Sequence, residues 1–151
     1  MKLPALALLA TLVSSRAMAA EDVQEKKGRV VVTTTTCEVL QPVMFAMNDA
    51  HLTRAHRKII HAVAQTLLGN PSIQLVEIEG FADGHETSPD RLGLARATAM
   101  KLALEAEGVP AFRLQVASLG ATRPLDKGVT ATGQERNRRL EFLIMRRDPS
   151  L

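Results

Sequence analysis

The chain has 151 residues, 46% of them hydrophobic, which is enough for one domain with a substantial core. The formal net charge is only +3, and two of the cations, Lys2 and Arg16, lie among the first 19 residues, so the composition does not favour nucleic-acid binding. Trp and Tyr are absent, which argues against a site that stacks sugars or bases on large aromatic rings.

Residues 1–19 have the pattern of a cleavable secretory signal peptide. Lys2 forms a positive n-region, residues 3–13 form an apolar h-region too short for a comfortable bilayer span, and Ala17-Met18-Ala19 matches a small-residue cleavage signal. We therefore predict secretion across the inner membrane into the periplasm, with no membrane span in the mature chain. No cysteine directly follows the predicted cleavage site, so we expect no lipoprotein anchor, and association with the outer membrane would require partners. An uncleaved anchor is the alternative interpretation.

Residues 20–38 are predicted to be a flexible leader followed by a first β segment. The stretch up to Arg29 is charged and aperiodic, whereas Val30 to Glu38 is rich in β-branched residues. Cys37 is the single cysteine, and we expect it to be a small buried hydrophobic residue, with a disulfide-linked dimer as the alternative. The main domain is predicted over residues 39–147, and residues 148–151 form a tail.

The domain opens with an extended piece from Val39 to Phe45, which Pro42 marks as an edge strand or a bulge. A first helix is predicted between Thr53, as N-cap, and Gly69, because its apolar residues recur every three or four positions. These residues are Ala55, Ile59, Ile60, Val63, Ala64, Leu67 and Leu68. Ile73 to Glu79 then alternates as a strand.

Ser88 and Pro89 indicate the start of a second helix, which ends near Ala106. Its predicted core face contains Leu92, Ala95, Ala99, Met100, Ala103 and Leu104. A short strand over Leu114–Leu119, a long loop over Gly120–Glu135 and a last strand over Arg139–Met145 complete the chain. The predicted fold class is α+β, with two main helices packed on one side of a mixed, roughly four-stranded sheet.

The junction between the Ile73–Glu79 strand and the second helix carries the best candidate site. Asp83 lies in the connecting loop and Arg96 lies inside the helix, 13 residues later. If the loop folds back, the carboxylate can bind an ammonium group and the guanidinium can bind a carboxylate, so that together they hold a zwitterion. The alternative is an Asp83–Arg96 salt bridge that only fixes the loop.

The sequence does not favour an enzyme, a metal site or a cofactor. His51, His56 and His61 are five residues apart, which turns neighbours to different faces of a helix, whereas a helical zinc pair needs a spacing of four. The serines lack a nucleophile elbow, Asp83 and Glu86 show no sign of a matched acid and base, and no Gly-rich phosphate loop is present. A binding function is therefore expected.

Five short motifs occur in order between about Val39 and Arg146. They are Ile78-Glu79-Gly80-x-x-Asp83, Leu92-x-x-x-Arg96-Ala97-x-x-Met100, Gly108-Val109-Pro110-Ala111-x-Arg113-Leu114, Gly120-x-x-x-Pro124 and Asn137-Arg138-Arg139. This order resembles the OmpA-like C-terminal domain, a family that binds peptidoglycan. The resemblance implies recognition of diaminopimelate in the stem peptide, with Asp83 at its ammonium and Arg96 at its carboxylate.

The resemblance also implies a wider ligand-binding set, in which Phe81, Ala82, His85, Leu92 and Arg138 accompany the charged pair. His85 either contacts ligand or is simply exposed. Arg138 either orients Asp83 or touches a carboxylate, or else it is a polar flank of the last strand.

Several residues depart from the family pattern. Phe81-Ala82 replaces a His-Thr pair, Pro89 replaces an asparagine, Gly93 replaces a serine, and the loop is about two residues shorter. The charged pair thus survives while its neutral hydrogen-bonding partners are lost. Two functions are therefore predicted: peptidoglycan binding, or a protein–protein interaction module of an envelope complex with a degenerate ligand site.

Overall fold

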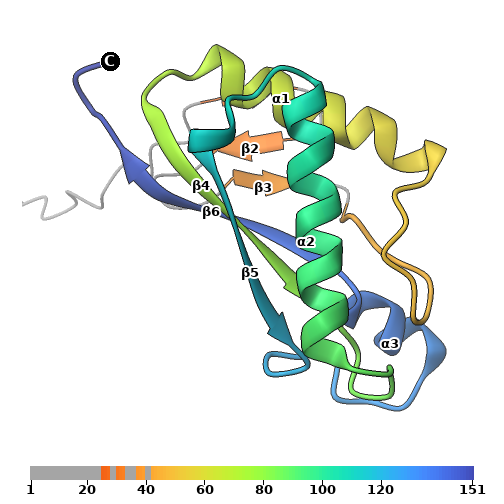
Figure 1. Ribbon diagram of the computed structural model, residues 1–151. Coiled ribbons are helices and arrows are strands. Elements are labelled where there is room, and N and C mark those ends of the chain that lie inside the picture. The colour runs from red at the N-terminus through yellow and green to blue at the C-terminus, as the bar shows by residue number, and fades with distance from the viewer. Residues whose placement is uncertain (1–24, 28–29, 33–36, 40–41) are drawn as a thin grey trace, which may run out of the picture.

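The computed structural model describes residues 25–27, 30–32, 37–39 and 42–151 (Figure 1). The predicted signal peptide, residues 1–19, lies outside these ranges. The fold is α+β, as predicted, and consists of a central mixed sheet, two long helices and a small second sheet. None of the helices in the described part of the chain is long and apolar enough to cross a membrane.

The central sheet contains β4 (Ile73–Phe81), β5 (Leu114–Gly120) and β6 (Leu140–Arg147), in the order β5-β4-β6. β4 pairs in parallel with β5 and antiparallel with β6. The sequence predicted an extended piece from Val39 to Phe45 and a roughly four-stranded sheet, but this sheet has three strands, and over residues 42–45 the structure has an isolated bridge between Met44 and Arg139. Pro42 has no N–H to donate to a ladder, which explains why this edge stays so short.

The two faces of β4 have different surroundings. Val76 and Ile78 point into the core with Phe142 of β6, because one register pairs Ile78 with Phe142. Glu77 and Glu79 lie on the opposite face, where Glu79 is in register with Glu141. This alternation is the pattern of a half-buried strand that carries polar groups away from the helices.

The long helices are α1 (Arg57–Gly69), which follows the 3-10 turn η1 (Arg54–His56), and α2 (Pro89–Ala106). The predicted bounds of α2 and most of the predicted apolar face of the first helix agree with the structure. The exceptions are Leu68, which is exposed, and Ala55, which is exposed and lies in η1. The predicted face of α2 is partly wrong. Ala95 is exposed, and the buried residues are Gly93, Arg96, Ala97, Met100 and Leu104.

A close backbone contact explains this orientation of α2. A Cβ atom on Gly80 of β4 would overlap the carbonyl oxygen of Gly93, and a Cβ on Gly93 would lie 2.5 Å from the carbonyl oxygen of Gly80. Because both positions are glycine and carry no Cβ, the first turns of α2 can lie directly on β4. Gly93 therefore faces inward, and Arg96, three residues later, is carried to the same buried side.

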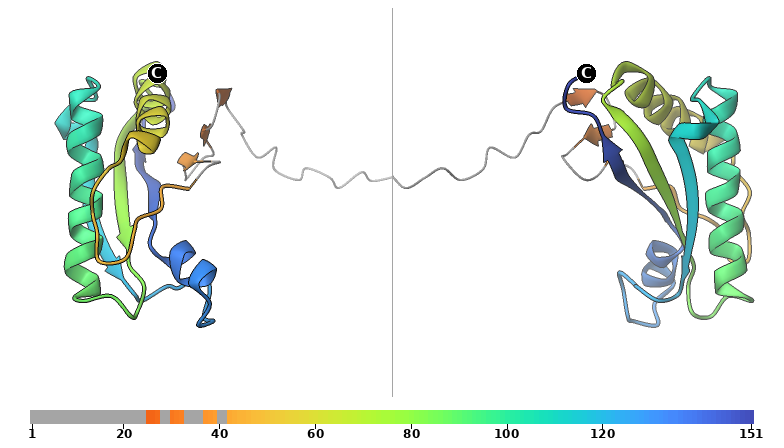
Figure 2. Two further views of the ribbon diagram at one scale, coloured as in Figure 1. Left: turned by 90° about the vertical axis from the view of Figure 1, so that its right-hand side faces the viewer. Right: turned by 60° about the vertical axis from the view of Figure 1, so that its left-hand side comes forward.

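Shorter elements complete the fold. β1 (Glu25–Lys27), β2 (Val30–Val32) and β3 (Cys37–Val39) form the second, antiparallel sheet, on the side of the central sheet away from α2 (Figure 2). Part of the expected leader thus forms β1. The 3-10 turn η2 (Ala111–Arg113) precedes β5.

The expected long loop after β5 contains a short helix, α3 (Ala131–Asn137). The Thr130 side chain caps it by accepting a hydrogen bond from Gly133 N at 3.1 Å. Only Gly133 and Asn137 of this helix are buried, so the sequence has no apolar periodicity there to reveal it.

Candidate functional site

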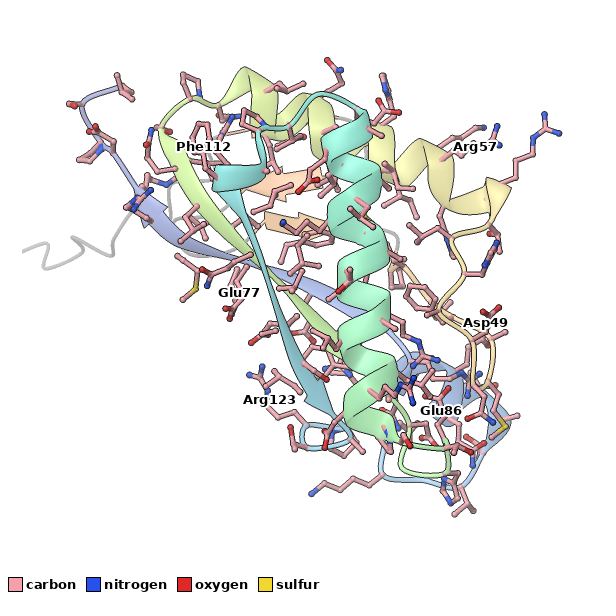
Figure 3. All side chains as sticks on the ribbon, viewed as in Figure 1. Asp49, Arg57, Glu77, Glu86, Phe112 and Arg123 are labelled. Atoms are coloured by element: carbon pink, nitrogen blue, oxygen red, sulfur yellow. The ribbon has the colours of Figure 1, made fainter. Side chains whose placement is uncertain are left out.

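The candidate site lies where β4 ends, in the loop that leads to α2. Figure 3 shows Glu86 at the end of the molecule where α2 begins, with Asp49 on a neighbouring segment. Asn48 joins the two segments: its backbone N–H donates to Glu86 Oε1 at 2.7 Å, and its side chain accepts from Thr87 N at 2.8 Å. The site is therefore built from two stretches that are 39 residues apart in the chain.

Arg96 lies at the centre of this junction and has no exposed surface. Its Nε donates to Asp49 O at 2.8 Å, Nη1 donates to Phe81 O at 3.1 Å, and Nη2 donates to Ala46 O at 3.2 Å. Nη1 and Nη2 also donate to the carboxylate of Glu86, at 2.8 and 2.6 Å. These bonds use all five N–H groups of the guanidinium.

Glu86 is the residue that neutralises Arg96, and its side chain is also fully buried. Besides the two bonds from Arg96, its oxygens accept from Asn48 N and from Asp83 N, the latter at 2.9 Å. Burial raises the pKa of Glu86, but the bonds from Arg96 and from these two backbone N–H groups outweigh it, so the pKa lies below its ordinary value. Glu86 is therefore a stable anion at neutral pH.

The structure does not contain the Asp83–Arg96 ion pair that was the alternative interpretation of the sequence. Both residues lie at the predicted junction, but Glu86, and not Asp83, forms the ion pair with Arg96. All N–H groups of Arg96 are paired within the chain, so none is left for a ligand. The sequence suggested Asp83 because it directly follows the strand. The turn Asp83–Glu86, closed by Glu86 N donating to Asp83 O, instead directs Glu86 toward the helix.

Asp83 is 3% exposed and faces His85 and Asn137. Its Oδ1 accepts from His85 N at 3.0 Å and lies 2.7 Å from His85 Nδ1, while Oδ2 accepts from Asn137 Nδ2 at 3.1 Å. Burial raises the pKa of Asp83, but these hydrogen bonds lower it to below its ordinary value. A carboxylate has about four acceptor positions, so Asp83 keeps about one.

His85 connects Asp83 to the surface. Its side chain is 58% exposed, whereas that of Asp83 is nearly covered. Because an ionised carboxylate only accepts hydrogen bonds, the Nδ1 of His85 carries the proton, and Nε2 remains for solvent or a ligand. The predicted neighbourhood of Asp83 and His85 is thus present.

The remaining predicted site residues have mixed surroundings. Phe81 is buried, with the guanidinium carbons of Arg139 and Arg123 at 3.9 and 5.3 Å from its ring centre. Ala82 is buried and its N–H donates to Gly120 O, while Leu92 is half-buried in the first turn of α2. These three residues therefore pack in the interior of the junction.

Arg138 is 9% exposed and donates from Nε to Phe45 O at 2.8 Å. The same segment continues to Ala46, whose carbonyl accepts from Arg96. Arg138 therefore holds one wall of the site in place, beside the Phe45 ring that lies 5.1 Å from the guanidinium of Arg96.

Sequence reasoning missed two residues of the junction as site residues, Glu86 and Asn137. Asn137 is buried; it donates to Asp83 and to Asp126 O at 2.7 Å, and it accepts from Asp126 N at 3.0 Å. Its position beside two arginines in a short motif was the available signal. For Glu86 the only signal was its acidic character within the loop.

The three histidines considered for a metal site, His51, His56 and His61, do not form a cluster with one another. His56 packs against Phe45 in a tilted arrangement with ring centres 5.7 Å apart, and His61 Nδ1 lies 2.8 Å from Glu107 Oε2. Among the residues that the structure describes, no three His, Cys, Asp or Glu side chains gather in a way that would hold a metal ion.

The fold and the site define a small α+β domain with a charged, hydrogen-bonded junction between a strand and a helix. A match to the OmpA family covers residues 44–138, and the chain belongs to this family. Among curated proteins it is 32% identical over 105 residues to the probable lipoprotein YiaD of Escherichia coli, covering 68% of this chain and 47% of YiaD.

Two further similarities agree with this assignment. The chain is 30% identical over 105 residues to the peptidoglycan-binding protein ArfA of Mycobacterium tuberculosis, covering 68% of this chain and 32% of ArfA. The peptidoglycan-associated lipoprotein of Burkholderia pseudomallei superposes with a TM-score of 0.63 at 27% identity, over 68% of this chain and 87% of that one. The chain spans only 33%, 61% and 47% of three curated relatives, MotY, YfiB and YiaD.

Proposed function

We propose that this protein is a non-catalytic peptidoglycan-binding protein of the cell envelope that acts in the periplasm. Family membership supports this proposal, because relatives at about 30% identity include proteins named as peptidoglycan-binding and peptidoglycan-associated. The observation that carries it is Asp83, a buried and ionised carboxylate that retains an acceptor position behind a solvent-exposed imidazole.

The proposed contact is between Asp83 and the ammonium group of diaminopimelate in the stem peptide. A charge-assisted hydrogen bond of this kind is worth about 1.5–3 kcal/mol when shielded from water. Asn137 and His85 keep the carboxylate ionised and oriented, so that little reorganisation is needed on binding. A single contact of this strength is reversible, and the many equivalent sites on the polymer would raise retention if the protein or its partner is multivalent.

Co-sedimentation with purified diaminopimelate-type sacculi tests this proposal. The variants are Asp83→Asn, which removes the charge with little change of shape, and Asp148→Asn, the same substitution in the C-terminal tail after β6. We expect the unmodified protein and Asp148→Asn to pellet equally, and Asp83→Asn to bind about tenfold more weakly. Folding is checked by far-UV circular dichroism, because the chain has no Trp.

Two outcomes would contradict the proposal: unmodified protein that stays in the supernatant at low salt, or folded Asp83→Asn that pellets like the unmodified protein. The first outcome would favour the second candidate, an interaction module of an envelope complex. One observation favours that candidate, namely that Arg96 is fully paired within the chain and offers no N–H to a ligand.

A further inference from the structure

We infer that Glu86 sets the ligand class of this site: it occupies Arg96 as the chain's own carboxylate, so the site recognises an amino group and does not recognise the carboxylate beside it. The inference rests on the proposed function for its ligand, and on the geometry of Glu86 and Arg96 for its mechanism. It predicts that peptidoglycan with lysine in the stem peptide is bound as well as peptidoglycan with diaminopimelate.

Arg96 and Glu86 are both saturated by hydrogen bonds within the chain. Arg96 meets Glu86 with two parallel N–H···O bonds, which is the geometry that a guanidinium also uses for a free carboxylate. Its remaining three N–H groups go to backbone carbonyls of Ala46, Asp49 and Phe81. A ligand carboxylate has no N–H of Arg96 to bind unless Glu86 leaves.

Displacing Glu86 from Arg96 would be energetically costly. The side chain is fully buried and accepts four hydrogen bonds, two of them from the backbone of Asn48 and Asp83. It is also tethered ten residues from Arg96, so its effective concentration at the guanidinium far exceeds that of any free carboxylate. A ligand carboxylate therefore does not compete.

With Arg96 occupied, Asp83 and His85 are the groups of the site that remain for a ligand. His85 is exposed at the surface end of the junction, and the ionised carboxylate of Asp83, which is nearly covered behind it, attracts an ammonium group. The side chains of lysine and diaminopimelate both end in an ammonium group. Diaminopimelate has, in addition, a carboxylate beside that ammonium, which a free Arg96 would bind. With Arg96 occupied, that difference carries no binding energy at this position.

Two measurements test the inference. In the first, the unmodified protein is co-sedimented with lysine-type and with diaminopimelate-type sacculi, and we expect affinities within about twofold. In the second, melting is followed by far-UV circular dichroism in sodium acetate and in sodium chloride at equal ionic strength and pH. The proteins compared are the unmodified chain, Glu86→Ala and Glu107→Ala, the last being a control at an exposed ion pair.

Glu86→Ala leaves a carboxylate-sized space against the buried guanidinium of Arg96. Acetate can fill it, so we expect acetate to raise the melting temperature of Glu86→Ala by about 4 °C or more, and to leave the other two proteins unchanged. The same variant should prefer diaminopimelate-type sacculi about tenfold. The comparison of the two sacculi with the unmodified protein does not depend on the folding of any variant.

A tenfold preference of the unmodified protein for diaminopimelate-type sacculi would overturn the inference, as would folded Glu86→Ala that gains nothing from acetate. If the unmodified protein pellets with neither wall type, the proposed function fails. Stabilisation of Glu86→Ala by acetate would then still support Glu86 as the occupant of the carboxylate position, and its absence would contradict that role.

Discussion

Glu86 and Arg96 form a two-bond ion pair, with Nη1–Oε2 and Nη2–Oε1 distances of 2.8 and 2.6 Å, and neither side chain has exposed surface. The pair joins the loop after β4 to α2, and through Ala46 and Asp49 it also joins the segment that precedes α1. Removing one member of such a pair leaves the other charge buried without compensation.

We therefore expect Glu86→Gln to lower the free energy of unfolding by about 3–5 kcal/mol. Urea unfolding followed by far-UV circular dichroism measures this change. Glu107→Gln is the matched control, because the same substitution at the exposed His61–Glu107 pair should cost less than about 1 kcal/mol. Equal costs at the two positions would mean that the buried pair contributes no more than a surface contact.

The sequence was sufficient for the elements that have strong local signals. Ser88-Pro89 and Gly108 indicated the start and the end of α2, and the alternation from Ile73 to Glu79 indicated β4. The site predicted from the sequence lies at the junction of β4 and α2 and stays a prediction. The mixed sheet was predicted from the order of strands and helices, and the family from the order of the five motifs.

The details of the site depended on contacts that no local pattern encodes. Asp83 and Glu86 are both acidic residues of one short loop, and only the turn between them decides which of the two reaches Arg96. The inward face of α2 was misjudged for a related reason. Periodicity ranks Ala95 above Gly93, but the backbone contact of Gly93 with Gly80 determines the rotation of the helix.

Acid should destabilise the protein through Asp83 and Glu86. The pKa of each lies below its ordinary value, 3.8 and 4.5, so at low pH the unfolded chain binds more protons than the folded one. Their contribution is complete above pH 4.5 and is lost as the pH falls through the lowered folded values. Urea midpoints measured from pH 7 to pH 3 should therefore fall below pH 4.5.

Two variants test this assignment of the acid sensitivity. Glu86→Gln should flatten the fall, because it removes one of the two groups. Burial raises the pKa of Glu79, and this outweighs the attraction of Arg123, so its contribution has the opposite sign. That contribution changes above pH 4.5, where the folded chain takes up the proton first. Glu79→Gln should therefore enlarge the total fall between pH 7 and pH 3, and a smaller total fall in this variant would contradict the assignment.

Gly93→Ala should destabilise the protein despite the higher helix propensity of alanine. The new methyl group would lie 2.5 Å from Gly80 O and would also overlap the Ser118 hydroxyl, so α2 must move away from β4. Overpacking of this kind typically costs about 1–3 kcal/mol. Gly69→Ala is the control, because nothing lies within 4 Å of a Cβ at the end of α1, and it should be neutral or slightly stabilising.

Asn137 should be essential to the charge state of Asp83. In Asn137→Asp the N–H donors to Asp83 Oδ2 and Asp126 O are lost, and a second carboxylate is placed within hydrogen-bonding distance of the first. We expect the free energy of unfolding to fall by about 3 kcal/mol or more at pH 7, against about 1–2 kcal/mol for Asn137→Ala, which removes the donors without adding a charge.

The difference between the two variants in urea unfolding isolates the repulsion between the carboxylates. It should shrink as the pH is lowered toward 4, where the new carboxyl group takes up a proton and can donate to Asp83 in place of the amide. A difference that stays constant between pH 7 and pH 4 would show that packing, and not charge, makes Asn137 necessary.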